Sequence, residues 1–216
     1  MEDQSKEKKI QETLESIKEN INIDMLEEAI VDNELVFPID GVEYKVIKPS
    51  WGEKTQVQEF QVKKYLEMLK DKNIPLEQDL RKTYKERGID IDEMEKRNRV
   101  LEKEKQDAQY KLGELLAKSG IEQDIQIFKN QIIDLQNEQL EILVRKASLL
   151  SLSLESQLFN YVYSYLTMLV TYKKEGENWV RLWKTYDDMK AATDELVNKI
   201  AAKASVVLRD EINTKA

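Results

Sequence analysis

The sequence predicts a mainly α fold. It comprises a long antiparallel helical hairpin with a coiled-coil-like pattern, a C-terminal helical bundle and one small N-terminal β-hairpin. Glycine and proline, the residues that break helices, number only 6 and 3 among 216 residues. Apolar residues repeat at heptad spacing through much of residues 91–150, which is typical of paired long helices. One strong turn signal, Asp40-Gly41, interrupts the helical pattern near the N-terminus.

Four segments are expected from the changes in pattern along the chain. They are an N-terminal helical arm (1–33), a β-hairpin with a two-helix segment (34–90), the long helical hairpin (91–150) and the C-terminal helical bundle (151–216). In the arm, a 4-3-4 spacing predicts a helix over residues 6–21, with Ile10, Leu14, Ile17 and Ile21 on one face. A second short helix is expected over residues 22–30.

The stretch "LVFPIDGVEYKVI", residues 35–47, predicts the β-hairpin. Asp40-Gly41 favours a two-residue type I′ turn, because that turn needs positive φ at both central positions. The register that this turn sets places six apolar side chains on one face: Leu35, Phe37, Ile39, Val42, Tyr44 and Val46. An isolated hairpin is marginal in water, so this face must be covered. We expect it to be a docking ribbon for a partner protein, with coverage by the same chain as the alternative.

Two helices should follow the hairpin. Ser50 and Glu53 form a capping-box pattern at the start of a helix that runs to about Lys70. A shorter helix comes next, with Pro75 suited to its first turn and Gly88 to its C′ position.

Two long helices should form the helical hairpin. Asp90 and Glu93 predict the start of a helix over 91–118, whose apolar stripe is thin: Met94, Leu101, Ala108 and Leu115. After a break at Gly120, a second apolar stripe keeps a 4-3-4-3 rhythm through Ile121, Ile125, Phe128, Ile132, Leu135, Gln139 and Ile142. An antiparallel hairpin of helices is the expected arrangement, and a single unbroken rod is the alternative. We also take Met94, Leu101 and Leu115 as candidate protein-interaction residues.

The C-terminal segment should be a helical bundle. The heptad spacing continues through Leu140, Leu143, Ala147, Leu150 and Leu154, and serines predict a break near 151–156. A turn at Gly176 should lead into two closing helices over 179–192 and 193–208. Glu155 is expected to be a structural cap or part of a solvated turn. The aromatic residues of this segment are expected in the core or in a subunit interface.

The composition argues against the common kinds of active site. The chain has no cysteine and no histidine, which removes thiolate nucleophiles, cysteine-based zinc sites and the side chain most used for proton transfer near neutral pH. The formal net charge is −8, with basic and acidic residues interleaved, so no nucleic-acid partner is expected. We expect no enzyme activity, no cofactor and no metal site.

No membrane partner is expected either. The first twenty residues lack the apolar core of a signal peptide. The most apolar stretch, residues 158–172, is too short to span a bilayer comfortably and is interrupted by Asn160, Ser164 and Thr167. A soluble protein made in the cytosol is the expectation.

Five motifs follow one another within residues 35–205: "FPIDGVEYKVIKPSW", "KYLEMLKDKNIPLEQDLRKTYKERGID", "EMEKRNRVLEKE", "LLSLSLESQLFNYVYSYL" and "TYKKEGENWVRLWKTYDDM". Their order resembles a group of uncharacterised tailed-bacteriophage proteins associated with tail or virion assembly. The positions that correspond to the group are Glu155, Phe159, Tyr165, Gly176, Trp183 and Tyr186. The chain departs from the group in having serines where the break is otherwise threonine-rich, and in a longer N-terminal helix.

The resemblance implies a bacteriophage structural or tail-assembly protein that acts by protein–protein contact and is non-catalytic. Its expected partners are other virion or tail proteins, with a homo-oligomer as a further alternative. Its expected location is the host cytoplasm during assembly, and both retention in the finished virion and loss from it stay open. The alternative function is a cytosolic coiled-coil adaptor or chaperone-like binding module unrelated to virions. An enzyme that uses glutamate, lysine or tyrosine alone is the third class.

Overall fold

The computed structural model describes residues 33–118 and 121–209, which divide into two compact units. The sheet unit comprises the described residues up to Lys70 and those from Leu158 onward, and the helix-pair unit is Asp71–Gln157. The helices expected at 6–21 and 22–30, and the break expected at Gly120, lie outside the described residues. The described residues form seven helices and four strands, so the predicted mainly helical character is confirmed.

The predicted N-terminal hairpin forms with the predicted register. Strands β1 (Glu34–Ile39) and β2 (Val42–Ile47) are antiparallel. The φ angles of Asp40 (49°) and Gly41 (78°) are both positive, as a type I′ turn requires. Cross-strand partners are Ile39 with Val42, Phe37 with Tyr44 and Leu35 with Val46. Local turn chemistry therefore set the register of this hairpin.

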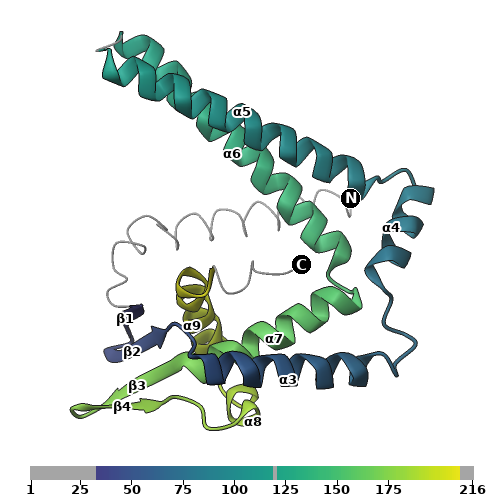
Figure 1. The fold of residues 1–216 in the computed structure, drawn as a ribbon, viewed down its shortest axis with the longest axis vertical. Coiled ribbons are helices and arrows are strands. Elements are labelled where there is room, and N and C mark those ends of the chain that lie inside the picture. The colour runs from purple at the N-terminus through teal and green to yellow at the C-terminus, as the bar shows by residue number, and fades with distance from the viewer. Residues whose placement is uncertain (1–32, 119–120, 210–216) are drawn as a thin grey trace. The chain divides into compact units, whose positions relative to one another are not determined.

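The expectation of a single β-hairpin is wrong, because a second hairpin extends the first into a four-stranded antiparallel sheet. Strands β3 (Thr171–Glu175) and β4 (Asn178–Arg181) are joined at Gly176, whose φ is 63°. The strand order is β1-β2-β3-β4 (Figure 1). The helix expected over 179–192 is reduced to α8 (Tyr186–Lys190). The aromatic and β-branched residues of the second hairpin favour strands. Its strand β3 pairs with β2, and apolar periodicity along the sequence does not reveal such a pairing between distant segments.

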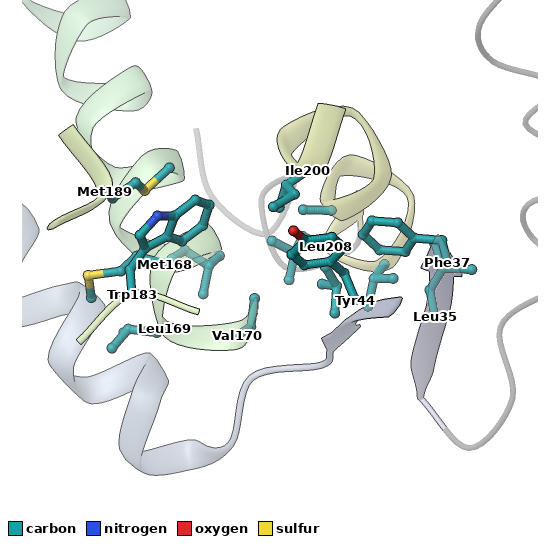
Figure 2. Packing of buried hydrophobic residues seen from close by; sticks show 14 of the residues in the cluster. Leu35, Phe37, Tyr44, Met168, Leu169, Val170, Trp183, Met189, Ile200 and Leu208 are labelled. Carbon is teal, nitrogen blue, oxygen red and sulfur yellow. The ribbon is translucent and has the colours of Figure 1, made fainter. Parts of the chain in front are cut away.

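The core of the sheet unit lies where α7 (Leu154–Val170) and α9 (Asp194–Val207) meet the inner face of the sheet. Figure 2 shows Phe37, Tyr44 and Leu208 at one end of this cluster, and Trp183, Met168 and Met189 at the other. The Tyr163 hydroxyl of α7 donates a 2.6 Å hydrogen bond to the Ala201 carbonyl of α9. Burial of this phenol raises its pKa to about 12. The sheet is thus closed on one face by helices from the distant C-terminal part of the chain.

Helix α3 (Trp51–Met68) packs against this core through aromatic contacts. Its N-terminus carries the predicted capping box, since Glu53 N donates to Ser50 Oγ at 3.3 Å and Ser50 N donates to Glu53 Oε2 at 2.9 Å. Phe60 stacks on Tyr165 of α7 with ring centroids 4.1 Å apart. The Lys64 ammonium lies 4.4 Å from the Tyr161 ring, within the range of a cation–π contact.

The helix-pair unit is built on α5 (Ile91–Ala117) and α6 (Glu122–Leu150), which run side by side in opposite directions (Figure 1). Arg97 Nε donates to Glu138 Oε1 at 2.8 Å, and Gln139 Nε2 donates to Glu102 Oε2 at 2.9 Å. Supercoiled coiled-coil packing of the two helices stays a prediction. The short helix α4 (Glu77–Glu86) precedes α5 and completes the unit.

Polar groups at the helix ends hold this unit together. Asp90 caps α5, accepting hydrogen bonds from Asp92 N at 3.0 Å and Glu93 N at 3.2 Å. Gly88 follows α4 with a φ of 82°, as expected for a C′ glycine. Pro75 precedes α4 instead of lying in its first turn, and its carbonyl accepts a 2.8 Å bond from Leu154 N.

The break expected near 151–156 is present, because α6 ends at Leu150 and α7 begins at Leu154. Just after this break, Glu155 Oε2 accepts a 2.8 Å hydrogen bond from Glu77 N, the first residue of α4. Leu76, the N-cap residue of α4, makes no side-chain capping bond. Glu155 therefore supplies the cap of a helix far from it in sequence, which confirms a capping role and identifies its target.

Candidate protein-interaction site

The face of the β1–β2 hairpin, expected to be a docking ribbon, is part of the core instead. Leu35, Phe37, Ile39, Tyr44 and Val46 are buried and Val42 is partly buried, all in one apolar cluster. Helix α9 packs against both strands, and Val46 has an exposed fraction of 0%. A face already covered by its own chain has no apolar area left for a partner. The structure therefore shows the alternative expectation, in which the same chain covers the apolar face of this hairpin.

The candidate residues on α5 also lie in an internal contact. Leu101 has an exposed fraction of 0%, while Met94 and Leu115 are partly buried. All three lie on the stripe that faces α6, where Ile125 is buried. The narrow apolar stripe of α5, from which a partner protein was predicted, is therefore covered by α6 of the same chain.

An exposed apolar face on α3 was not expected from the sequence. It carries five large side chains with exposed fractions between 40% and 83%, namely Trp51, Val62, Tyr65, Leu66 and Leu69. We call these five residues the α3 face. Val62, Tyr65, Leu66 and Leu69 form a contiguous stripe, since residues three, four and seven apart lie close together on a helix. Trp51 lies on the same side but eleven positions before Val62, beyond Thr55 and Gln58. A contiguous apolar stripe, unlike a scattered exposed leucine, indicates an interaction surface.

The opposite side of α3 is fixed to the body of the sheet unit. Met68 and Glu53 are buried there, and Phe60 stacks on Tyr165. The Glu53 carboxylate accepts a 2.7 Å bond from Arg181 of β4. The helix is thus apolar on two sides, and only one of them is used within the unit. Val62, seven positions before Leu69, is the residue whose spacing signals this second stripe in the sequence.

The surroundings of the α3 face are basic. Lys63 and Lys70 each follow a residue of the face by one position and are exposed. Lys64 Nζ donates to Glu67 Oε1 at 2.9 Å. This hydrogen bond and the charge of Lys64 lower the pKa of Glu67, and the nearby charges of Lys63 and Lys70 lower it further. From residue 59 to residue 70, Lys63, Lys64 and Lys70 stand against Glu59 and Glu67, which leaves one excess positive charge on a chain whose formal net charge is −8.

A second surface, on the outer face of the sheet, combines aromatic and charged groups in balance. The Lys45 ammonium lies 5.0 Å from the Trp179 ring and 5.9 Å from the Tyr172 ring. Lys45 pairs with Glu34 at 3.0 Å, and Lys174 pairs with Glu43. Because each lysine has its own carboxylate, this surface presents no excess charge to a partner.

Searches for other site types and for related proteins give short results. Within residues 33–118 and 121–209, no group of three or more acidic side chains is placed to hold a metal ion. No helix in the described part of the chain has the length and apolar character needed to cross a bilayer. Comparison of the chain with protein-family models, curated proteins and solved structures finds no match.

Proposed function

We propose that the protein is a non-catalytic binding protein that contacts other proteins through the α3 face. The observation that carries the proposal is the exposure of five large apolar side chains on one side of a helix whose other side is already packed. Two of the five, Trp51 and Tyr65, belong to residue types enriched among the dominant contacts of protein interfaces.

The α3 face is suited to a partner helix. Val62, Leu66 and Leu69 follow a 4-3 spacing, which is the pattern by which two helices pack along a stripe. The contiguous part of the face, from Val62 to Leu69, covers about two helical turns, which corresponds to a contact about 11 Å long. Because stacking of Phe60 on Tyr165 fixes the other side of α3, the partner would meet a surface that is already ordered, which reduces the entropic cost of binding.

We further propose that this binding serves the assembly of a bacteriophage tail or virion, with other virion or tail proteins as partners. Support for this step is the resemblance of the sequence motifs to tail-assembly proteins, which covers segments of both units. The proposed location is the host cytoplasm during assembly, and then the particle.

Complementation of a phage deletion tests both steps. In a phage whose genome encodes the chain, deletion of the gene should abolish or deplete complete particles, and wild-type protein should restore them. Leu66→Asp places a charge in the α3 face and should fail to restore particles. Gln56→Asp, an equal charge change at an exposed position outside the face on the same helix, should restore them. Matching tryptophan fluorescence would show that both variants fold, and equal restoration by both would overturn the proposal.

The alternative function is a cytosolic adaptor or chaperone-like module. It is favoured by exposed apolar residues along α6, among them Ile127, Ile133 and Leu143, because such side chains on paired helices could hold an unfolded client. Under this alternative, deletion would leave particle yield unchanged. The protein would instead suppress aggregation of a heat-denatured enzyme, and Ile133→Asp would reduce that suppression.

A further inference from the structure

We infer that the α3 face takes an amphipathic partner helix whose flanking positions carry carboxylates. The inference rests on the proposed function of the α3 face and specifies the chemistry of the partner. Its basis is the combination of an exposed apolar stripe at helical spacing with lysines beside it.

The two lysines stand at the same offset from the stripe. Lys63 follows Val62 within α3, and Lys70 follows Leu69, the C-cap residue. Lys70 N donates to the Glu67 carbonyl at 3.2 Å, so the chain continues the last helical turn and keeps Lys70 near the flank of Lys63. Two carboxylates share this flank: Glu59, four residues before Lys63, and Glu67, which accepts a hydrogen bond from Lys64. Against these two, Lys63, Lys64 and Lys70 leave an excess of one positive charge. A partner with glutamates seven residues apart would meet both lysines at once, and complementary charges of this kind select partners and speed their encounter.

Other occupants fit the same surface less well. A second copy packed on the α3 face would contribute lysines to a flank that is already basic, and such like-charge contacts disfavour association. A partner in an extended conformation binds by adding a strand to the open edge of a sheet. The side of a helix has no such edge, so the α3 face does not suit a partner of this kind. The outer face of the sheet has its lysines paired with glutamates and selects no particular charge.

Two synthetic peptides test the inference directly. Both would have 18 residues, the length of α3, with leucines at 4-3 spacing in an alanine background. One carries glutamates at the flanking positions and the other carries lysines. Fluorescence anisotropy with the full-length protein at low salt should show the glutamate peptide binding about tenfold more tightly. The difference should shrink as salt is added, because the charges are exposed.

Charge reversal supplies the sharper arm of the experiment. The double variant Lys63→Glu, Lys70→Glu should reverse the preference, so that the lysine peptide binds more tightly. A control with the same change of net charge, Lys111→Glu with Lys129→Glu on the exposed sides of α5 and α6, should keep the wild-type preference. Leu66→Asp should weaken binding of both peptides, because it disrupts the apolar stripe.

The outcomes separate the inference from the proposed function. Equal binding of both peptides, or binding of neither, overturns the acidic-helix inference, and the function still stands if Leu66→Asp blocks particle assembly. Equal restoration of particles by Leu66→Asp and Gln56→Asp overturns the function itself. A dimer seen by light scattering that Leu66→Asp dissociates would replace the acidic partner with a second copy of the chain.

Discussion

The sheet unit and the helix-pair unit reach folded structures by different means. Sixteen buried apolar side chains lie in the described part of the sheet unit, but only six lie in the helix-pair unit, which has a similar described length. The six are Ile91, Leu101, Ala108, Ile125, Leu150 and Leu154. A sheet covered by helices encloses a volume, whereas two paired helices share only one stripe.

Polar contacts compensate for the thin apolar stripe of the helix pair. Arg81 bonds to Glu77, Asp92 and Glu95 at 2.6–2.8 Å and so joins α4 to α5. Glu95 also pairs with Lys146 of α6. The sheet unit also has ion pairs between elements, such as Glu53 with Arg181 and Glu43 with Lys174, but they supplement a larger apolar core. We therefore expect the helix-pair unit to be more sensitive to changes in charge, and the sheet unit more sensitive to changes in volume.

The largest effect is expected from Phe37→Ala in the core of the sheet unit. Loss of this buried ring should lower the free energy of unfolding by about 4 kcal/mol. All three tryptophans, Trp51, Trp179 and Trp183, belong to the sheet unit, so tryptophan fluorescence during urea unfolding reports on this unit alone. Val36→Ala, at the exposed neighbouring position, should change little. An equal loss in both variants would show that the hairpin face is not core.

Leu101→Ala should have the next largest effect, this time on the helix-pair unit. Removal of a side chain with an exposed fraction of 0% should cost about 3 kcal/mol. The loss should appear in the helical circular dichroism transition and leave the tryptophan transition in place. Val100→Ala, at an exposed position, is the matched control. A common shift of both transitions would mean that the two units unfold together.

A smaller effect is expected at Gln139, the polar residue in the stripe of α6. Its amide donates to Glu102 Oε2 at 2.9 Å and accepts from Lys105 Nζ at 3.1 Å. Gln139→Ala should therefore lower the stability of the helix pair by about 1–2 kcal/mol, measured by urea unfolding with circular dichroism. Gln136→Ala, at an exposed position, should have no comparable effect. If Gln139→Leu proves as damaging as Gln139→Ala, the site needs the hydrogen bonds and not merely a filled volume.

The smallest effect is a difference in acid sensitivity between the units. The hydrogen bond from Arg81, followed by that from Lys146, lowers the pKa of Glu95, while Lys105 lowers that of Glu102 and Arg97 that of Glu138. A lowered folded-state pKa means that the stabilisation is complete above the ordinary glutamate value of about 4.3 and is lost as the pH falls through the lower folded value.

The pKa values of Glu67, Asp188 and Glu195 in the sheet unit are also lowered, but by partners within the same helix or its cap. Because Glu95 and Glu138 connect different helices, a fall from about pH 5 to pH 3 should weaken the helix pair more than the sheet unit. Urea unfolding followed by circular dichroism for the helix pair and by tryptophan fluorescence for the sheet unit measures this difference. Glu95→Gln should reduce this dependence, since it removes the titrating group. Parallel weakening of both units would show that the ion pairs between helices add no more acid sensitivity than the local pairs of the sheet unit.

Features specified by local chemistry could be predicted from the sequence. The Asp40-Gly41 turn, the Ser50–Glu53 capping box and the Asp90 cap all appear where the residues indicated them. Each depends on contacts between residues a few positions apart, and such contacts need no knowledge of the rest of the fold. The stripe that includes Ile125 and Gln139 was likewise visible as a heptad rhythm.

The candidate site could not be predicted in the same way. Periodicity shows that α3 is rich in apolar residues, but it does not show which side the protein covers. That choice depends on Phe60 meeting Tyr165, more than a hundred positions away. The same limitation explains the β1–β2 face, whose burial depends on α9.

The sequence by itself determined the turns, the helix caps and the long helices, because short-range hydrogen bonds and helical periodicity are encoded by neighbouring residues. Only the tertiary structure decided that β3 and β4 join the first hairpin, that Glu155 caps α4, and that the outer side of α3 remains exposed. These outcomes depend on which distant segments compete for the same apolar surface, and that competition is resolved only when the chain packs.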